Sequence, residues 1–221
     1  YNAEDMRRAL GDRVARWRGH SDTEVLLEWI ALNGLRSALQ AANGMFAIAL
    51  WDRRERTLSL ARDRMGKKPL YWSRDRGRVV FGSELRALRC HPDVPREIDP
   101  AALATYLRHG YVLHPLTIHK GVEQLAPGHA VTLDAEGRGE PAPFWSLADV
   151  ARAGLSGPFA GSDAEAVDRF GEILGEAVRR RLVSDVPLGA FLSGGIDSST
   201  VVALMQRATG APVRTFTIGF E

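Results

Sequence analysis

The chain has 221 residues, of which 45% are hydrophobic and 25% are charged, and its net charge at neutral pH is +2. This balance is typical of a globular protein and excludes a disordered or collagen-like chain, and the length suits one large domain or two small ones. Cys90, the one cysteine of the sequence, cannot support a disulfide framework or a multi-cysteine zinc site. We therefore expect a cytoplasmic protein.

Membrane and nucleic-acid partners are not expected. The longest apolar run, residues 45–51, is far shorter than the roughly 20 residues of a membrane-spanning helix. The chain starts with polar and acidic residues, unlike a secretory leader. Basic residues are densest between Arg53 and Arg78, but acidic residues are interspersed there, so we interpret this stretch as a solvated face. A nucleic-acid-binding face is the alternative.

The N-terminal 42 residues are predicted to be helical. Asn2 caps a first helix, whose apolar residues recur at helical spacing: Met6, Leu10, Val14 and Trp17. Ser21-Asp22-Thr23-Glu24 has the pattern of a capping box, and Asn33-Gly34 ends the helix that it opens. Residues 35–42 form a short third helix.

Short apolar runs separated by turn residues predict consecutive antiparallel strands at 45–52, 57–62, 69–73 and 79–82. Residues 83–90 are predicted to be helical. Asp99-Pro100 predicts the start of a helix over 100–109, which Gly110 closes. Residues 129–133 form a further strand.

Residues 137–162 are rich in proline and glycine, and we predict a linker at 141–162 within this stretch. Beyond it, Ser162 can cap a helix with one apolar face. A strand over 187–192, a helix over 197–207 and a strand over 213–220 then form a parallel crossover unit. We expect an α+β domain with antiparallel sheets over residues 1–140, followed by the start of an α/β domain over 163–221.

The segment between that strand and helix predicts an anion site. Its sequence is Ser193-Gly194-Gly195-Ile196-Asp197-Ser198-Ser199. The glycines leave backbone N–H groups open to a phosphate, the serines add hydroxyl donors, and the following helix points its positive end at the same place. Asp197 can hold a Mg²⁺ ion that bridges phosphates. The alternative is a plain glycine-rich turn.

These residues resemble the pyrophosphate loop of adenylating enzymes, and the segment before them resembles the glutamine-hydrolysing asparagine synthetases. Further motifs resemble the glutaminase half of that family: His20–Val25, Gly44–Ala47, Ala61–Gly66, Pro69–Tyr71, Gly82–Leu85 and Pro127–His129. Each motif is short, and their order and joint presence make the resemblance specific.

The resemblance implies a glutaminase-like (Ntn-type) domain that releases ammonia and a parallel-sheet domain that adenylates aspartate with ATP and Mg²⁺. Ammonia then displaces AMP to give asparagine. No organic prosthetic group is implied, the partners are the small-molecule substrates, and a homodimer of the intact protein is a possible assembly. Related enzymes amidate other carboxylates, such as sugar acids, and a non-catalytic degenerate homologue is a further alternative.

The resemblance also assigns residues. Asp22 matches the acceptor for the glutamine α-ammonium, and its alternative role is to favour the dipole of its helix. Leu192 and Ile218 match positions beside the adenine or ribose, and their alternative role is core packing. The nucleophilic cysteine would lie upstream of Tyr1, so we expect an internal fragment without a catalytic residue and without glutaminase activity of its own. Cys90 is interpreted as an ordinary helix-end residue, and no histidine is assigned to a metal.

Overall fold

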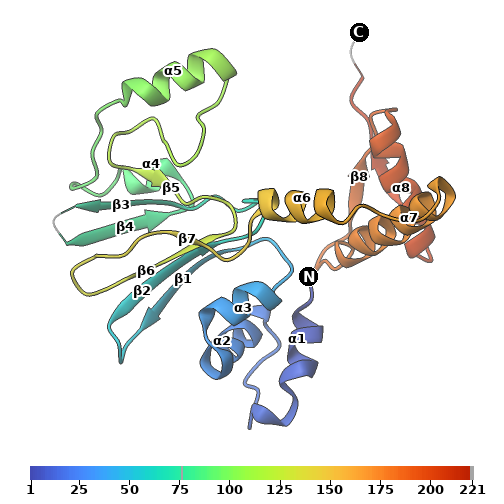
Figure 1. Ribbon diagram of the computed structural model, residues 1–221, viewed down its shortest axis with the longest axis horizontal. Coiled ribbons are helices and arrows are strands. Elements are labelled where there is room, and N and C mark those ends of the chain that lie inside the picture. Colours follow the sequence, from blue (N-terminus) through green and yellow to red (C-terminus); the bar gives the residue numbers. More distant parts are fainter. Residues whose placement is uncertain (76, 220–221) are drawn as a thin grey trace. The chain divides into compact units, whose positions relative to one another are not determined.

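The computed structural model describes residues 1–75 and 77–219 (Figure 1). The chain divides into two compact units, and each is described by itself. The larger unit is Glu4–Arg152, and the smaller unit comprises Tyr1–Ala3 and Ala153–Glu221. In the described part of the chain, no helix is both long enough and apolar enough to cross a membrane.

The larger unit begins with short helices that share one apolar cluster. They are α1 (Ala3–Leu10), a 3-10 turn (Gly11–Arg13), α2 (Asp22–Asn33) and α3 (Leu35–Ala41). The prediction of one helix reaching Trp17 was wrong, because Gly11 adopts a φ of 50° and ends α1. Val14 nevertheless packs with Met6 and Leu10 in the same cluster, which explains the helical spacing that suggested a longer helix.

Two antiparallel sheets form the centre of the larger unit, as the sequence predicted. One has the strand order β1 (Ala47–Asp52), β2 (Thr57–Arg62), β6 (His129–Leu133) and β7 (Ala142–Pro143). The other has the order β4 (Arg78–Gly82), β3 (Tyr71–Asp75) and β5 (Glu123–Gln124). The sheets pack against each other (Figure 1), since their side chains share one buried cluster that includes Leu60 of β2, Trp72 of β3 and Val131 of β6.

The helices after the second sheet match their predictions to different extents. Helix α4 (Leu85–Leu88) is shorter than the predicted helix over 83–90. Helix α5 (Pro100–His109) has the predicted limits. The Asp99 carboxylate accepts hydrogen bonds from the N–H groups of Ala101 and Ala102, and Gly110 ends the helix with a φ of 78°. Because both ends of α5 depend on local residues, the sequence was sufficient to locate them.

The predicted linker contains ordered structure. Strand β7 pairs with β6, and Phe144, 7% exposed, packs with Leu39 and Ala61. Helix α6 (Leu147–Ser156) follows, and the two compact units divide within it, between Arg152 and Ala153. The packing of Phe144 extends the larger unit beyond residue 140.

The smaller unit contains the predicted parallel crossover. Helix α7 (Asp163–Arg180) begins at Ser162 with a complete capping box, and strands β8 (Gly189–Phe191) and β9 (Arg214–Phe216) are parallel neighbours. Helix α8 (Ile196–Ala208) connects them. The predicted second strand continues to Phe220, which lies outside the described residues, whereas β9 ends at Phe216.

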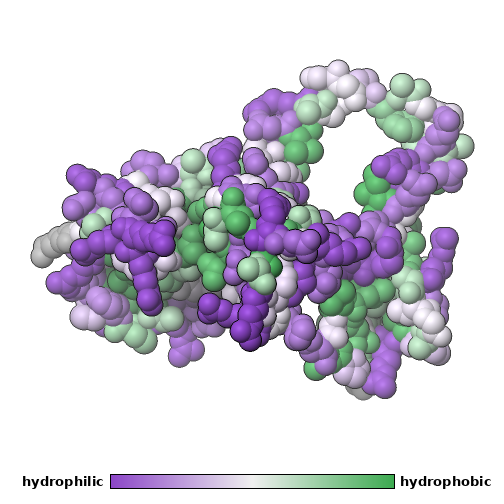
Figure 2. Space-filling view, turned by 90° about the horizontal axis from the view of Figure 1, so that it is seen from below, coloured by the Kyte–Doolittle hydropathy of each residue, from purple (hydrophilic) through white to green (hydrophobic). Residues whose placement is uncertain are grey.

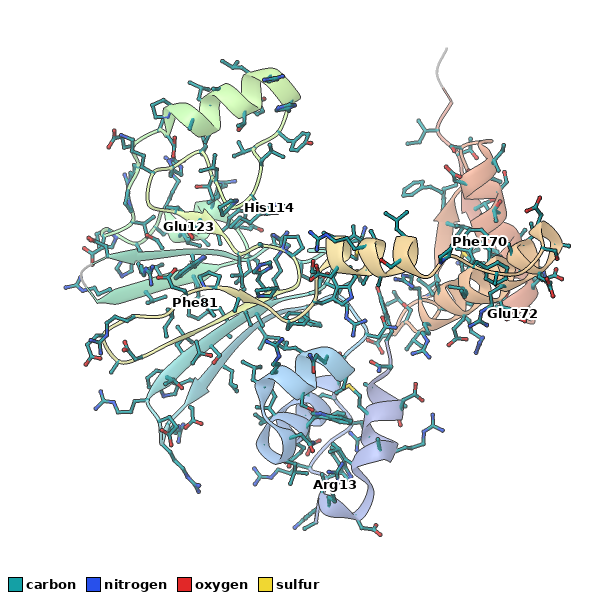
Figure 3. The ribbon with its side chains drawn as sticks, viewed as in Figure 1. Arg13, Phe81, His114, Glu123, Phe170 and Glu172 are labelled. Carbon is teal, nitrogen blue, oxygen red and sulfur yellow. The ribbon has the colours of Figure 1, made fainter. Side chains whose placement is uncertain are left out.

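The smaller unit exposes apolar side chains on its helices and strands. Phe170 of α7 is 63% exposed and Phe191 of β8 is 76% exposed, while Val178 and Met205 are buried. Phe170 lies on the same helix as Glu172 (Figure 3). Glu172 forms an ion pair with Arg169. Figure 2 shows hydrophobic surface among the hydrophilic side chains of the face it presents. A crossover with two strands therefore has little core of its own.

Candidate functional site

The loop from Leu192 to Gly195 joins the carboxyl end of β8 to the amino end of α8. Gly194 has a φ of 78°, a conformation that favours glycine, and nothing lies within 4 Å of a Cβ placed there. Gly195 is the N-cap of α8, with an extended backbone and no side-chain hydrogen bond to the helix. The first turn of α8 is therefore available for an anion, which suits a helix amino end.

A serine of this loop is hydrogen-bonded to a serine in the first turn of α8. The hydroxyl oxygens of Ser193 and Ser198 lie 3.0 Å apart, and the Ser193 N–H donates to Ser198 Oγ at 3.3 Å. The Ser198 hydroxyl also contacts the Gly195 carbonyl oxygen at 3.2 Å. These bonds hold the loop against the first turn of the helix, so the hydroxyls expected to contact an anion are here engaged in shaping its site. Ser199, whose N–H donates to the Gly195 carbonyl, begins the helical bonding.

Asp197 lies in the first turn of α8 and is exposed. Among the described residues, no group of three or more His, Cys, Asp or Glu side chains could hold a metal ion. A single carboxylate nonetheless fits Mg²⁺, which keeps several waters and is usually held by one or two carboxylates together with substrate phosphates. Asp197 would then be the protein ligand of a metal bound with the phosphates.

Leu192 and Ile218 follow the paired ends of β8 and β9. Leu192 is half-buried, and its N–H donates to the Phe216 carbonyl at 2.9 Å. Ile218 is 71% exposed. Both lie at the carboxyl end of a parallel sheet, the edge where open α/β sheets bind ligands.

Asp22 lies at the start of α2, at a distinct place in the larger unit. It is exposed, and the Thr23 hydroxyl donates to its Oδ1 at 3.4 Å. Ser21 caps the helix by accepting the Glu24 N–H at 3.2 Å. The capping box is only half formed, because the Glu24 carboxylate accepts the N–H groups of Arg18 (2.6 Å) and Gly19 (2.9 Å). These bonds, first that from Arg18, lower the pKa of Glu24 and anchor the segment before Asp22.

The charged pair Arg62 and Asp63 was not singled out in the sequence as an organising element. Arg62 is 6% exposed and Asp63 is 1% exposed, at the end of β2. Burial lowers the pKa of Arg62, and the neighbouring Asp63 opposes this shift. The sequence signal was available: two adjacent charges follow an apolar strand and precede Gly66, which has a φ of 62°.

Cys90 is exposed, and its Sγ lies 3.4 Å from the Arg86 carbonyl oxygen, just beyond α4. With Arg86, Arg89 and Arg96 it lines a hollow of about 180 Å³. The cysteine keeps its interpretation as a helix-end residue.

Comparison with known proteins identifies the family. Residues 1–145 match the family described as glutamine amidotransferase domain, and residues 169–221 match asparagine synthase. The chain belongs to the glutamine amidotransferase domain family. It is 35% identical to asparagine synthetase [glutamine-hydrolyzing] 3 of Bacillus subtilis over 230 aligned positions, which cover 100% of this chain and 35% of that protein.

The comparisons also found a relative with a different name and a matching solved structure. Amidase chry2 of Gibberella zeae is 31% identical over 93% of this chain and 29% of its own length. Among solved structures, glutamine phosphoribosylpyrophosphate amidotransferase from B. subtilis aligns over 97% of this chain and 43% of its own, with 19% identity and a TM-score of 0.43. The chain spans about a third of the length of the curated synthetase relatives, namely 35%, 38% and 33% of the first three.

Proposed function

We propose that the protein containing this chain is a glutamine-dependent asparagine synthetase. Water hydrolyses glutamine to glutamate and ammonia in the first domain. ATP and aspartate form an aspartyl-adenylate and diphosphate in the second, and ammonia displaces AMP to give asparagine. Adenylation converts a poor leaving group into a good one before the weak nucleophile arrives. The observation that carries the proposal is the order of the two matching segments, with the glycine loop within the second.

Each proposed site residue has a role. The N–H groups at the start of α8 and the backbone of Gly194 and Gly195 would bind the diphosphate part of ATP, with Ser193, Ser198 and Ser199 around it. Asp197 would hold Mg²⁺, and Leu192 and Ile218 would flank the nucleoside. The uncapped helix end and the φ of 78° at Gly194 support this assignment.

In the larger unit, Asp22 would accept the α-ammonium group of glutamine. Its exposure at the first turn of a helix anchored by Glu24 supports this role, because the carboxylate projects from a fixed backbone. The nucleophile for glutamine hydrolysis is not assigned to any residue of this chain. The domains proposed from the sequence are 1–140 and 163–221, joined by 141–162, and the packing of Phe144 supports an end of the first beyond residue 140.

We also propose a cytoplasmic location and small molecules as the partners, without nucleic acid, with a homodimer as the candidate assembly of the intact protein. The small-molecule partners follow from the proposed reaction, whereas the location and the homodimer are proposed from the single cysteine and from the family resemblance.

The acceptor can be tested directly in the intact enzyme. With aspartate, ATP and glutamine labelled with ¹⁵N in its amide, the label should appear in the side-chain amide of asparagine, with AMP and diphosphate in equal amounts. The second candidate has another carboxylate, such as a sugar acid, as the acceptor, and one relative, Amidase chry2, has a name other than asparagine synthetase. AMP formation that depends on such an acid and not on aspartate would support that candidate and contradict asparagine synthesis.

A further inference from the structure

The ends of β8 and β9 are joined by a side chain where a backbone hydrogen bond would be expected. The last paired residues of the two strands are Phe191 and Phe216. One residue later, the Leu192 N–H still donates to the Phe216 carbonyl at 2.9 Å. In a regular parallel ladder, the next bond would run from the Ile218 N–H to the Leu192 carbonyl. Instead, the Thr217 hydroxyl donates to that carbonyl, with Oγ1 and O 2.7 Å apart.

The Thr217 hydroxyl thus takes the place of a backbone donor next to the proposed nucleotide site. It lies at the carboxyl edge of the parallel strands, directly before the loop that begins at Ser193. Leu192 is held by two bonds, one through its N–H and one through its carbonyl, so its position relative to β9 is fixed. The ladder ends there, and Ile218 continues without the bond that would have drawn it to Leu192.

We propose that Thr217 is a positioning residue for nucleotide binding, because its hydroxyl ends the β8–β9 ladder and sets the spacing between Leu192 and Ile218. This inference rests on the proposed function, in which those two residues flank the nucleoside of ATP. Thr217 acts through Leu192 and needs no contact with ATP. The same bond fixes the point from which Ser193, Gly194 and Gly195 leave the strand.

The chain provides a matched set of variants. Thr217→Val keeps the shape of the side chain and removes the donor, and Thr217→Ser keeps the donor. Thr215→Val is the control, because Thr215 is an exposed threonine two residues earlier, paired through its backbone with Ala190. Thr215 lies within β9 and Thr217 follows its last residue.

The experiment measures aspartate-dependent exchange between ATP and diphosphate in the intact enzyme, together with calorimetric binding of ATP and hydrogen–deuterium exchange of the segment 189–195. Loss of one hydrogen bond to a partly buried carbonyl should raise the KM and the Kd for ATP roughly 3- to 10-fold in Thr217→Val, with kcat near that of the wild type. Backbone amides of the segment should exchange faster. Thr217→Ser and Thr215→Val should match the wild type in all three measurements.

The possible outcomes distinguish a failure of the Thr217 role from a failure of the proposed ATP-dependent function. Wild-type ATP affinity and amide exchange in Thr217→Val would overturn the positioning role alone. An equal defect in Thr217→Ser, despite its hydroxyl, would also overturn it, because the effect would then come from packing of the methyl group. A wild-type enzyme that neither binds ATP nor supports exchange would overturn the proposed function.

Discussion

Arg62 and Asp63, neighbours in the chain, bind opposite kinds of backbone group around the loop after β2: Arg62 binds carbonyl oxygens and Asp63 binds N–H groups. The Arg62 guanidinium donates to the carbonyl oxygens of Lys68 (2.8 Å), Leu125 (2.8 Å) and Gly66 (2.7 Å). The Asp63 carboxylate accepts the N–H groups of Phe46, Met65, Lys67 and Lys68, between 2.9 and 3.3 Å. The pair therefore satisfies both kinds of backbone group where β2 ends, and joins this loop to the segment before β1.

Asp63→Asn should destabilise the larger unit. Two of the four N–H groups donate to one carboxylate oxygen and two donate to the other. In asparagine an NH2 group replaces one of these oxygens, and it cannot accept a hydrogen bond from the two N–H groups that face it. The expected loss in the free energy of unfolding is about 2–4 kcal/mol, measured by urea denaturation. Asp52→Asn is the control, because both N–H groups that Asp52 binds reach the same oxygen, which asparagine can retain. Equal stability of the two variants would contradict this role for Asp63.

The start of α2 should depend on pH through Glu24. The pKa of Glu24 is lowered from its ordinary value of 4.5 in the folded protein. The bonds from Arg18 and Gly19 therefore stabilise the folded state fully at pH values above 4.5. The stabilisation is lost as the pH falls through the lowered folded-state pKa. The difference in urea midpoint between wild type and Glu24→Gln should therefore shrink as the pH is lowered below about 4.5. A difference that stays constant across this range would show that the carboxylate charge is not involved.

Local signals predicted part of this fold, and tertiary contacts decided the rest. Asp99, Pro100 and Gly110 fixed α5 because capping depends on a few adjacent residues. The same reasoning misassigned Glu24, whose carboxylate binds residues that precede the helix and not its N-cap. The short β7 and the burial of Phe144 depend on a sheet and helix formed by residues far away in the chain.

For the candidate site, the glycine loop and the crossover around it were predictable from spacing. The bond between the Ser193 and Ser198 hydroxyls was not, since the sequence identifies donors and not their partners. Likewise, Thr217 reaches Leu192 across 25 residues of chain, and no local pattern indicates that contact.

The smaller unit should be the less stable part of the 221-residue chain. Its two strands leave sheet edges unpaired within the described residues, and Phe191, Phe216 and Ile218 are exposed. Amides of 163–219 should therefore exchange with deuterium faster than those of β2 and β6, measured residue by residue. Protection of α8 equal to that of β2 would contradict this expectation.

Asp22→Asn in the intact enzyme should separate the two sources of nitrogen. The substitution removes the charge that would pair with the glutamine ammonium and keeps the side chain's size. Loss of one charge-assisted hydrogen bond should raise the KM for glutamine by about one to two orders of magnitude. Synthesis from added ammonium salt should continue at the wild-type rate. Equal loss of both activities would mean that Asp22 supports the fold, and unchanged glutamine kinetics would mean that another residue binds the ammonium.

The central claim is that the loop before α8 activates a carboxylate with ATP while glutamine is hydrolysed elsewhere. The most direct measurement is aspartate-dependent ATP–diphosphate exchange in the intact enzyme and its Asp197→Ala variant, with glutamine hydrolysis assayed in the same preparations. Exchange in the wild type, its loss in the variant and unchanged hydrolysis in both are the predicted results. Exchange at the wild-type rate in Asp197→Ala, or no exchange in the wild type, would contradict the account.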